Sequence, residues 1–334
     1  MGDRPTVVVL GATREDPPPG LLDALGDDAE LRFAVTTAEL RAALPGAEIL
    51  LVWDFRSDQL RDAWDARDGL RWIHVAGAGV DAVLSPKLLA SDVVLTNARG
   101  VFDDAMAEYV VMLMLVFAKD LLTTLEAQRV RHWRHRESER LSGATLVMVG
   151  AGAIGRAIAS RSRSLGMHVV GVARTARPDP DFERVVAIED LHAVLPEADY
   201  VVVAVPLTAE TEGMFAAREL GLLRPTARLV NVSRGRVVDE EALVAALRRR
   251  GLAGAALDVF ENEPLPSDSP LWEMPQVVVS PHMSGDFHGW LDALADVFVA
   301  NYRRWRAGED LVNVVDKQRG YVASSSVGRE TDAR

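Results

Sequence analysis

LVMVGAGAIG, at residues 146–155, is the stretch of sequence that decides the fold. Its four leading apolar residues predict a buried parallel strand, and the run from Arg156 to Leu165 predicts a helix closed by Gly166. Gly-x-Gly-x-x-Gly between a strand and a helix is the pattern of a dinucleotide-binding turn. The alternative is a glycine-rich turn that binds nothing, but a second strand, predicted from Met167 to Val172, favours the dinucleotide.

The residues of this motif have separate mechanical roles. Gly150 allows the tight turn, Gly152 lets the backbone approach a pyrophosphate, and Gly155 lets the helix pack closely on the strand. The amides of Ala153 and Ile154, together with the positive end of the helix dipole, would hold the phosphates. These five residues are therefore predicted to bind a cofactor.

The composition excludes several classes of protein. The chain has 334 residues, enough for two domains, and its formal net charge of −12 argues against a nucleic-acid or anionic-membrane surface. The absence of cysteine excludes disulfides and thiolate metal sites, and no metal is expected. The longest apolar run, Tyr109 to Ala118, is too short to span a bilayer, and no signal sequence is expected, so we predict a cytoplasmic protein.

Strands and helices alternate in the residues before the motif. Five strands are predicted there, at Thr6–Leu10, Leu31–Val35, Ile49–Trp53, Trp72–Val75 and Val93–Thr96. Thr37 is expected to cap a helix that ends at Leu44, and one long helix is expected from Ala105 to about Arg129. Because the same alternation continues after the motif, we predict an α/β protein with two doubly wound parallel-sheet (Rossmann-like) domains.

Three predicted strands of the second half end in residues that can do chemistry. Arg234 follows the strand predicted at 229–232, Asp258 follows 253–257, and His282 follows 277–279. Glu263 comes five residues after Asp258. Because parallel sheets bind ligands outside the carboxyl ends of their strands, we expect these side chains around one crevice. Each could instead be structural, as a solvated arginine, a helix-start carboxylate or a packed histidine, but the joint placement favours a site.

This set of residues suits hydride transfer to a 2-oxo acid. An arginine can bind a carboxylate through two hydrogen bonds and polarise the neighbouring carbonyl. A histidine can deliver the proton as the hydride reaches carbon, and a glutamate beside it favours the imidazolium and fixes the ring. We therefore predict Arg234, Glu263 and His282 as catalytic residues, and Asp258 as a partner of the nicotinamide carboxamide.

At these residues the sequence resembles the D-isomer specific 2-hydroxyacid dehydrogenase family, over nearly the whole chain. The stretches that carry the resemblance are 77–81 (GAGVD), 97–100 (NARG), 107–109 (AEY), 150–155 (GAGAIG), 205–208 (VPLT), 231–235 (NVSRG), 256–260 (ALDVF), 263–265 (EPL) and 280–282 (SPH). The last four are far more specific than the glycine motif alone.

The resemblance implies roles and a domain plan. It makes Arg234 the substrate-binding arginine, Glu263 the acid partner and His282 the acid/base. It implies a substrate domain at residues 1–99 and 285–320, a cofactor domain at 100–284 inserted into it, closure of the two around substrate, and a homodimer. Residues 322–334, polar and charged, are expected to form a disordered tail. Gly77, Ala78 and Gly79 are expected to grip the substrate carboxylate through their amides, although a plain strand–helix connection is the alternative.

One departure from the family pattern concerns the cofactor. Members that use NAD have an acidic residue at the end of the second strand of the cofactor domain, where this chain has Ala173-Arg174-Thr175. Arg174, Thr175 and Arg177 could instead bind the 2′-phosphate, so NADP(H) is favoured and NAD(H) is the alternative. Pro206 and Thr211, after the strand predicted at 200–205, are further candidates for cofactor contact.

Other functions stay open at this stage. Relatives include non-catalytic NAD(H)-binding sensors and corepressors, and formate, phosphite and phosphoglycerate dehydrogenases share the architecture. Glu263 argues against a formate enzyme, where glutamine is expected, and no additional regulatory domain is expected after residue 320. Glyoxylate, hydroxypyruvate and bulkier 2-oxo acids all remain possible substrates. The candidate walls of the substrate pocket are Trp53, Phe55, Phe102, Trp133 and Trp290.

Overall fold

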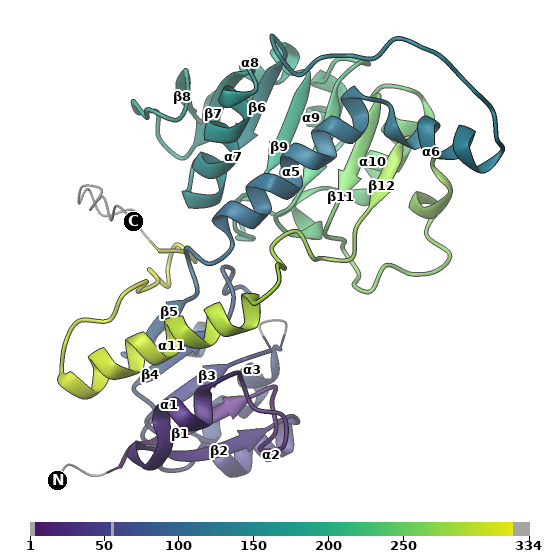
Figure 1. Cartoon of the computed structure of the whole chain (residues 1–334). Coiled ribbons are helices and arrows are strands. Elements are labelled where there is room, and N and C mark those ends of the chain that lie inside the picture. The colour runs from purple at the N-terminus through teal and green to yellow at the C-terminus, as the bar shows by residue number, and fades with distance from the viewer. Residues whose placement is uncertain (1–3, 55–56, 323–334) are drawn as a thin grey trace. The chain divides into compact units, whose positions relative to one another are not determined.

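The computed structural model describes residues 4–54 and 57–322, which form two compact units (Figure 1). Unit 1 consists of residues up to 99 together with those from 289 onward, and unit 2 consists of residues 100–288. The chain returns to unit 1 at Gly289 rather than at Gly285, where the sequence analysis placed the boundary. Phe55 and residues 323–334, which include nearly all of the expected disordered tail, lie outside the described residues.

Unit 1 is built on a parallel sheet whose three central strands, β1, β3 and β4, are fully buried. In its described residues the strand order is β2-β1-β3-β4-β5. The sequence alternates strand and helix, so each strand can return to the same edge through a helix. The strands are β1 (Thr6–Leu10), β2 (Glu30–Ala34), β3 (Ile49–Val52), β4 (Trp72–Val75) and β5 (Val94–Asn97), and the helices are α1 (Leu21–Leu25), α2 (Thr37–Ala43), α3 (Gln59–Ala63), α4 (Pro86–Leu89) and α11 (Trp290–Ala307), with 3₁₀ turns at Gly26–Asp28 and Trp64–Ala66.

Unit 2 contains a larger parallel sheet, in the order β12-β11-β10-β9-β6-β7-β8. Its strands are β6 (Thr145–Val149), β7 (His168–Ala173), β8 (Arg184–Ala187), β9 (Tyr200–Val203), β10 (Arg228–Asn231), β11 (Gly254–Leu257) and β12 (Val277–Val279). Its helices are α5 (Asp103–Ala118), α6 (Leu121–Arg129), α7 (Ala153–Ser164), α8 (Leu191–Val194), α9 (Ala217–Leu222) and α10 (Glu240–Arg248), with 3₁₀ turns at Ile188–Asp190, Leu195–Glu197, Gly235–Val237 and Pro270–Glu273.

The order of the strands in unit 2 reverses between β6 and β9. From β6 the chain builds outward through β7 and β8, and it then returns to β9 and continues in the other direction to β12. Helices α8, α9 and α10 contribute to one apolar core with the strands, and α5 contacts α7 and β10. This arrangement is the predicted doubly wound sheet, in which ligands bind at the carboxyl ends of the strands where the order reverses.

Two predictions about helices before the glycine motif were wrong. The long helix expected from Ala105 to Arg129 is divided into α5 and α6 by Asp120, whose φ of 47° is left-handed. Arg136 stabilises this break, because it donates to both the carboxylate and the backbone carbonyl of Asp120, each at 2.5 Å. The cap of α2 is Thr36 rather than Thr37, and its hydroxyl accepts from the amide of Glu39 in a reciprocal capping box.

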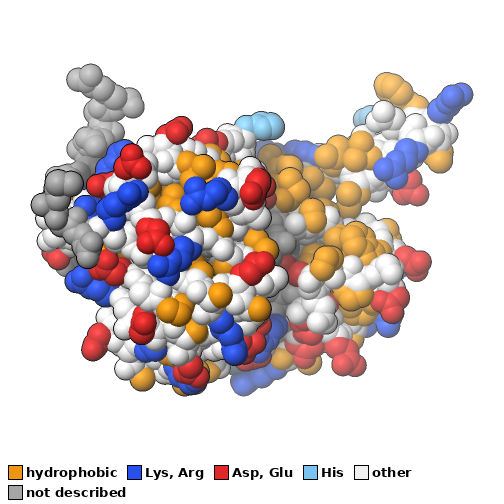
Figure 2. All heavy atoms as spheres, turned by 90° about the horizontal axis from the view of Figure 1, so that it is seen from below, with side chains coloured by type: hydrophobic (Ala, Val, Ile, Leu, Met, Phe, Trp, Pro, Cys, Tyr) orange, Lys and Arg blue, Asp and Glu red, His pale blue; other side chains and the backbone are white. Residues whose placement is uncertain are grey.

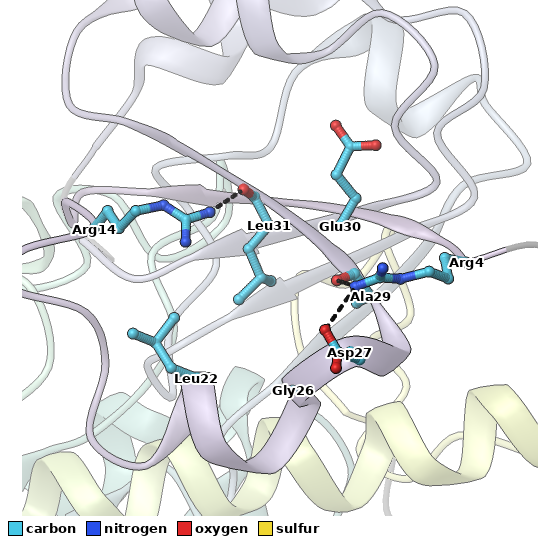
Figure 3. A pocket seen from close by; sticks show the side chains of 8 residues that line it. All are labelled: Arg4, Arg14, Leu22, Gly26, Asp27, Ala29, Glu30 and Leu31. Atoms are coloured by element: carbon cyan, nitrogen blue, oxygen red, sulfur yellow. Dashed lines mark hydrogen bonds and ion pairs between the residues drawn. The ribbon is translucent and has the colours of Figure 1, made fainter.

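The described surface of unit 1 carries charges of both signs. Figure 2 shows acidic and basic side chains interspersed over the face of this unit that it presents. A small pocket between the start of β2 and α1 contains Arg4 and Arg14 (Figure 3), but the Arg14 guanidinium donates to the carbonyl of Leu31, and Arg4 pairs with Asp27 at 3.6 Å. None of the predicted site residues lines it. Within the part of the chain that the structure describes, no helix is long and apolar enough to cross a membrane.

A buried histidine lies in the core of unit 1. His74 on β4 is completely buried, and its Nδ1 lies 2.8 Å from the hydroxyl of Thr96, which also accepts from the indole of Trp72. Its ring packs against Phe298 of α11, with the ring centroids 5.6 Å apart. Its Nε2 has no hydrogen-bond partner among the described residues. Burial therefore lowers the pKa of His74 to about 3, so the ring stays neutral in the folded protein.

This pKa predicts that acid destabilises the protein. The unfolded chain takes up a proton at residue 74 below its ordinary pKa of 6.5, whereas the folded chain does not until about 3, so stability is lost as the pH falls through this window. Between about pH 7 and about pH 5, wild type should lose about 2 kcal/mol more unfolding free energy than His74→Phe. Urea unfolding followed by circular dichroism at both pH values measures this, and equal losses in the two proteins would contradict it.

Candidate active site

The glycine motif forms a tight turn between β6 and α7, where the strand order reverses. Gly150 has a φ of 112°, and a Cβ on it would lie 2.5 Å from the carbonyl oxygen of Ala204, just after β9. A Cβ on Gly155 would lie 1.8 Å from the carbonyl oxygen of Gly150. Both positions therefore require glycine. Gly150 needs it for its positive φ and for the close approach of Ala204, and Gly155 needs it only for the close approach of Gly150.

The remaining glycine of the motif faces open space. A Cβ on Gly152 would meet no atom within 4 Å, although its neighbours in the turn are closely packed. The helix α7 begins at Ala153, three positions before the predicted Arg156, so Ala153 and Ile154 are its first residues and both are half-buried. A twelve-residue helix whose amino terminus opens onto a space kept clear by glycine fits a dinucleotide pyrophosphate.

The end of β7 carries arginine where an acidic residue would select NAD. Ala173 is the last residue of β7, and Arg174 and Thr175 follow it with exposed side chains. Arg177 donates to the carbonyl of Ala151 inside the glycine turn at 2.7 Å. The loop after β7 is thus attached directly to the glycine turn.

The first carboxylate after β7 is Asp179, and it faces inward. Its side chain is 4% exposed, accepts from Arg156 of α7 at 2.9 Å, and lies 3.7 Å from the guanidinium of Arg177. Asp179 therefore holds two cations beside the glycine turn, and its buried position gives no exposed carboxylate to repel a phosphate.

Pro206 and Thr211 belong to the loop that follows β9, the strand beside β6. The hydroxyl of Thr211 donates to the carbonyl of Pro206 at 2.6 Å and accepts from the amide of Thr208 at 2.8 Å. These bonds close the loop on itself at the switch in strand order. Both residues are half-buried, at the edge of the sheet where the glycine turn lies.

The three predicted strand-end residues lie on adjacent strands. Because the sheet order is β12-β11-β10, His282, Asp258 and Arg234 follow three neighbouring parallel strands at the same edge. The amide side chain of Asn231 shapes the turn before Arg234, since it donates to the Arg234 carbonyl at 3.1 Å and accepts from the hydroxyl of Ser233 at 2.7 Å. Arg234 itself is half-buried.

The histidine and the glutamate form a direct pair. Nδ1 of His282 lies 2.7 Å from Oε2 of Glu263, and the two side chains are 20% and 24% exposed. The other carboxylate oxygen of Glu263 accepts from the amide of Phe260 at 3.0 Å, which fixes the carboxylate plane. Because a carboxylate can only accept, Nδ1 carries a hydrogen and Nε2 is the nitrogen left to exchange a proton with a substrate.

The turn of Arg234 and the loop of Glu263 are in backbone contact. A Cβ on Gly235 would lie 1.8 Å from the carbonyl carbon of Phe260 and 2.3 Å from the nitrogen of Glu261. Only glycine lets these two segments touch. The spacing between the cation and the acid partner of the histidine is thus set by main-chain packing.

Further acidic residues lie next to this loop. The amide of Glu240, the first residue of α10, donates to Glu261 at 3.0 Å, and the amide of Glu261 donates back to the carboxylate of Glu240 at 2.5 Å. Burial, and then the negative charges of Glu261 and Glu263, raise the pKa of Glu240. Glu240 and Glu261 thus form an acidic pair next to the loop that carries Glu263.

Asp258 differs from the expectation in its surroundings. Its side chain is completely buried, and its carboxylate accepts from the hydroxyl of Ser280 at 2.5 Å and from the amides of Met283 and Ser284 at 2.9 Å each. These contacts tie Asp258 to the segment that carries His282. Contact with a nicotinamide carboxamide stays a prediction, with roughly one of four lone-pair directions left for it.

The predicted substrate turn belongs to unit 1. Gly77, Ala78 and Gly79 follow β4, and the side chain of Asn97 at the end of β5 donates to the carbonyl of Ala78 at 2.6 Å. The amide of Ala98 donates to the carbonyl of Gly77 at 2.9 Å. The turn is thus held by its carbonyl groups, and its part in binding substrate stays a prediction.

The candidate wall residues separate into different environments. Phe102 is 7% exposed and packs on Gly285, where a Cβ would lie 2.8 Å from its ring. Trp133, by contrast, is 95% exposed on the extended segment after α6. Trp53 and Trp290 are partly exposed residues of unit 1.

Sequence reasoning missed the polar residues behind the site. Asn231, Ser280 and Tyr109 each lie in a stretch that carries the family resemblance, and each makes a side-chain hydrogen bond next to a predicted site residue. A small polar residue within a strand, or a tyrosine in an apolar helix, was the available signal, because a buried polar group needs a partner.

Comparison with known proteins agrees with this architecture. Residues 111–284 match the family model described as D-isomer specific 2-hydroxyacid dehydrogenase, NAD binding domain. A glyoxylate reductase of Thermococcus gammatolerans is 33% identical over 266 residues, which are 77% of this chain and 79% of that protein. The fold and site define a dinucleotide-dependent oxidoreductase. The chain belongs to the D-isomer specific 2-hydroxyacid dehydrogenase family and is a glyoxylate reductase-like enzyme of it.

Solved structures extend the likeness to nearly the full length. The NADPH-dependent glyoxylate/hydroxypyruvate reductase of Sinorhizobium meliloti, in complex with NADP and sulfate, is 28% identical with a TM-score of 0.82, and the match covers 96% of this chain and 100% of that one. A D-isomer specific 2-hydroxyacid dehydrogenase of Xanthobacter autotrophicus, in complex with NADPH and MES, is 32% identical with a TM-score of 0.80 and the same coverage.

Proposed function

We propose that this enzyme is an NADPH-preferring reductase of small 2-oxo acids such as glyoxylate and hydroxypyruvate, and that its products are the 2-hydroxy acids, of D configuration where C2 is chiral. The observation that carries the proposal is the His282–Glu263 pair, whose nitrogen and oxygen lie 2.7 Å apart. His282 follows β12, and Arg234 follows β10 at the same edge of the sheet, with β11 between the two strands. A small substrate is supported by the names of the relatives, which are a glyoxylate reductase and a glyoxylate/hydroxypyruvate reductase.

In the proposed reaction each residue has one task. Arg234 binds the substrate carboxylate and draws electron density from the neighbouring carbonyl, because its guanidinium is planar and permanently charged. Imidazolium His282 donates its Nε2 proton to the carbonyl oxygen while it keeps the Nδ1 hydrogen bond to Glu263. The bound dinucleotide, when reduced, supplies the hydride that C2 receives. The oxidation of the hydroxy acid is the reverse, with His282 as the base.

The residues after β7 support a preference for NADP(H). Arg174 and Thr175 are exposed at the end of the strand, and the nearby carboxylate of Asp179 is buried against Arg156. A 2′-phosphate there would meet cations and a hydroxyl, whereas the ribose hydroxyls of NAD would lack a carboxylate to accept their hydrogen bonds. Two structural relatives are described as complexes with NADP or NADPH.

We also propose that the enzyme is a homodimer that pairs through unit 2. After α6 the chain runs outward and returns to β6 as an extended segment, at the right and top of unit 2 in Figure 1. This segment and α6 carry exposed apolar side chains: Leu121 at 40%, Leu125 at 43%, Val130 at 69% and Trp133 at 95%. Apolar side chains projecting on a segment without a sheet partner in the described residues suit the surface of a second copy.

Loss of the arginine tests the core of the proposal. Arg234→Ala should lower kcat/KM for glyoxylate with NADPH by about a hundredfold, because it removes both the carboxylate contact and the polarising charge. NADPH affinity, measured by fluorescence titration, should stay within about threefold. Arg236→Ala is the matched control, since this exposed arginine two positions on pairs with Glu212. A loss of less than about tenfold would remove Arg234 from the mechanism.

A second experiment addresses cofactor choice. Wild type should have a higher kcat/KM for NADPH than for NADH with the same 2-oxo acid. Arg174→Ala should reduce the NADPH value by about tenfold and leave the NADH value nearly unchanged, because only NADPH has the phosphate. The control is Arg184→Ala, which removes an exposed arginine on β8 that pairs with Glu197. It should change neither the NADPH value nor the NADH value. A preference for NADH in wild type would contradict the proposal.

The dimer is tested by the exposed tryptophan. Wild type should elute in size-exclusion chromatography with light scattering at twice the 36.4 kDa chain mass. Trp133→Ser should dissociate at higher protein concentration than wild type, because it removes the most exposed large apolar side chain from the surface. Trp272→Ser, at a tryptophan that is 52% exposed outside the segment, serves as the control. A monomeric wild type would refute the assembly.

A further inference from the structure

His282 is held in an unusual backbone conformation. Its φ is 54°, in the left-handed region that side chains other than glycine rarely adopt. Such a conformation persists only where the surroundings impose it. The two residues that follow, Met283 and Ser284, both direct their amides at the carboxylate of Asp258, at 2.9 Å each. One carboxylate thus fixes the turn that aims the imidazole.

The same carboxylate also holds the residue on the other side of the turn. The hydroxyl of Ser280 donates to Oδ1 of Asp258 at 2.5 Å, so residues 280, 283 and 284 converge on a single group. Asp258 is 0% exposed, and a buried charge is tolerated only when hydrogen bonds compensate for its lost hydration. Each of the three donors is therefore needed to keep Asp258 and the His282 turn in place.

A fourth residue completes this network from a distant part of the sequence. The phenolic oxygen of Tyr109, on α5, lies 2.7 Å from the hydroxyl oxygen of Ser280. Serine has one hydroxyl hydrogen, and Ser280 gives it to Asp258. Tyr109 must therefore be the donor to Ser280. The hydrogen bonds therefore run from Tyr109 to Ser280 and from Ser280 to Asp258. Tyr109 and Ser280 are 171 residues apart in sequence.

We propose that Tyr109 is a positioning residue for the acid/base pair, which orients the Ser280 hydroxyl toward Asp258 and so holds the left-handed turn that presents His282 to Glu263. The proposal rests on the proposed function, in which His282 transfers the proton. Helix α5 crosses the sheet of unit 2 (Figure 1) and contacts β10, so it is a rigid base for the Tyr109 side chain. The residue acts through Ser280 and does not itself touch the reacting atoms.

Removal of the Tyr109 hydroxyl should affect the chemical step more than cofactor binding. In Tyr109→Phe the Ser280 hydroxyl loses its donor and can turn away from Asp258, which loosens the His282 turn. We expect kcat for 2-oxo acid reduction to fall about fivefold, the effect of one typical hydrogen bond, with the KM for NADPH unchanged. Ser280→Ala should have at least this effect, and Ser280→Thr, which keeps the hydroxyl, should restore most of the activity.

Proton NMR of the histidine gives a readout that does not depend on turnover. The Nδ1 hydrogen of His282, held by the carboxylate of Glu263, should give a low-field resonance, assigned by its absence in His282→Gln. Tyr109→Phe and Ser280→Ala should weaken this signal or move it to higher field. Tyr200→Phe is the matched control, because its phenol also lies against α5, 3.5 Å from the carbonyl of Met114, but has no link to Ser280.

The outcomes separate the two proposals. An unchanged resonance and kcat in Tyr109→Phe and Ser280→Ala would overturn the positioning role, and so would equal effects in Tyr200→Phe, since these would reflect general loosening of α5. If wild type turned over no 2-oxo acid, the proposed function would fail. The resonance would still show whether Tyr109 holds the histidine.

Discussion

Parallel pairing of β10, β11 and β12 is the constraint on which the rest of the site depends. Their registers place Asn231 beside Leu257 and Leu257 beside Val279, so the three strands end level with one another. In a parallel sheet all carboxyl ends lie on one edge, and the residues after them must share it. Arg234 and His282 are 48 positions apart in sequence. Strand pairing brings them to the same edge, and no direct contact between the two residues is needed.

Backbone contact then sets the finer geometry. Gly235 touches the main chain at Phe260, and Gly155 touches the carbonyl of Gly150, in each case at a distance that excludes any side chain. Main chain is stiffer than side chain, so these contacts position the strand-end residues and the glycine turn more exactly than rotamers could. The polar network of Asp258 adds the remaining restraint, because a buried carboxylate cannot lose its donors without a large cost in free energy.

The sequence predicted those features that depend on local pattern. The apolar runs at 146–149 and 200–203 are buried strands, and the run at 277–279 is a half-buried strand, as the apolar pattern predicted. Local pattern failed at Asp120, where a left-handed residue held by Arg136 ends α5 within an otherwise helical sequence. That hydrogen bond spans sixteen positions, so no propensity window contains it.

For the site, the sequence by itself determined which groups exist and which strand each one ends, because strand ends are visible as the change from apolar residues to Arg234, Asp258 and His282. Only the tertiary structure decided how they are used. It paired Nδ1 of His282 with Glu263, buried Asp258 against residues 280–284, and brought Tyr109 to Ser280. These are contacts between segments far apart in the chain, and their geometry follows from strand order and packing, which residue spacing does not encode.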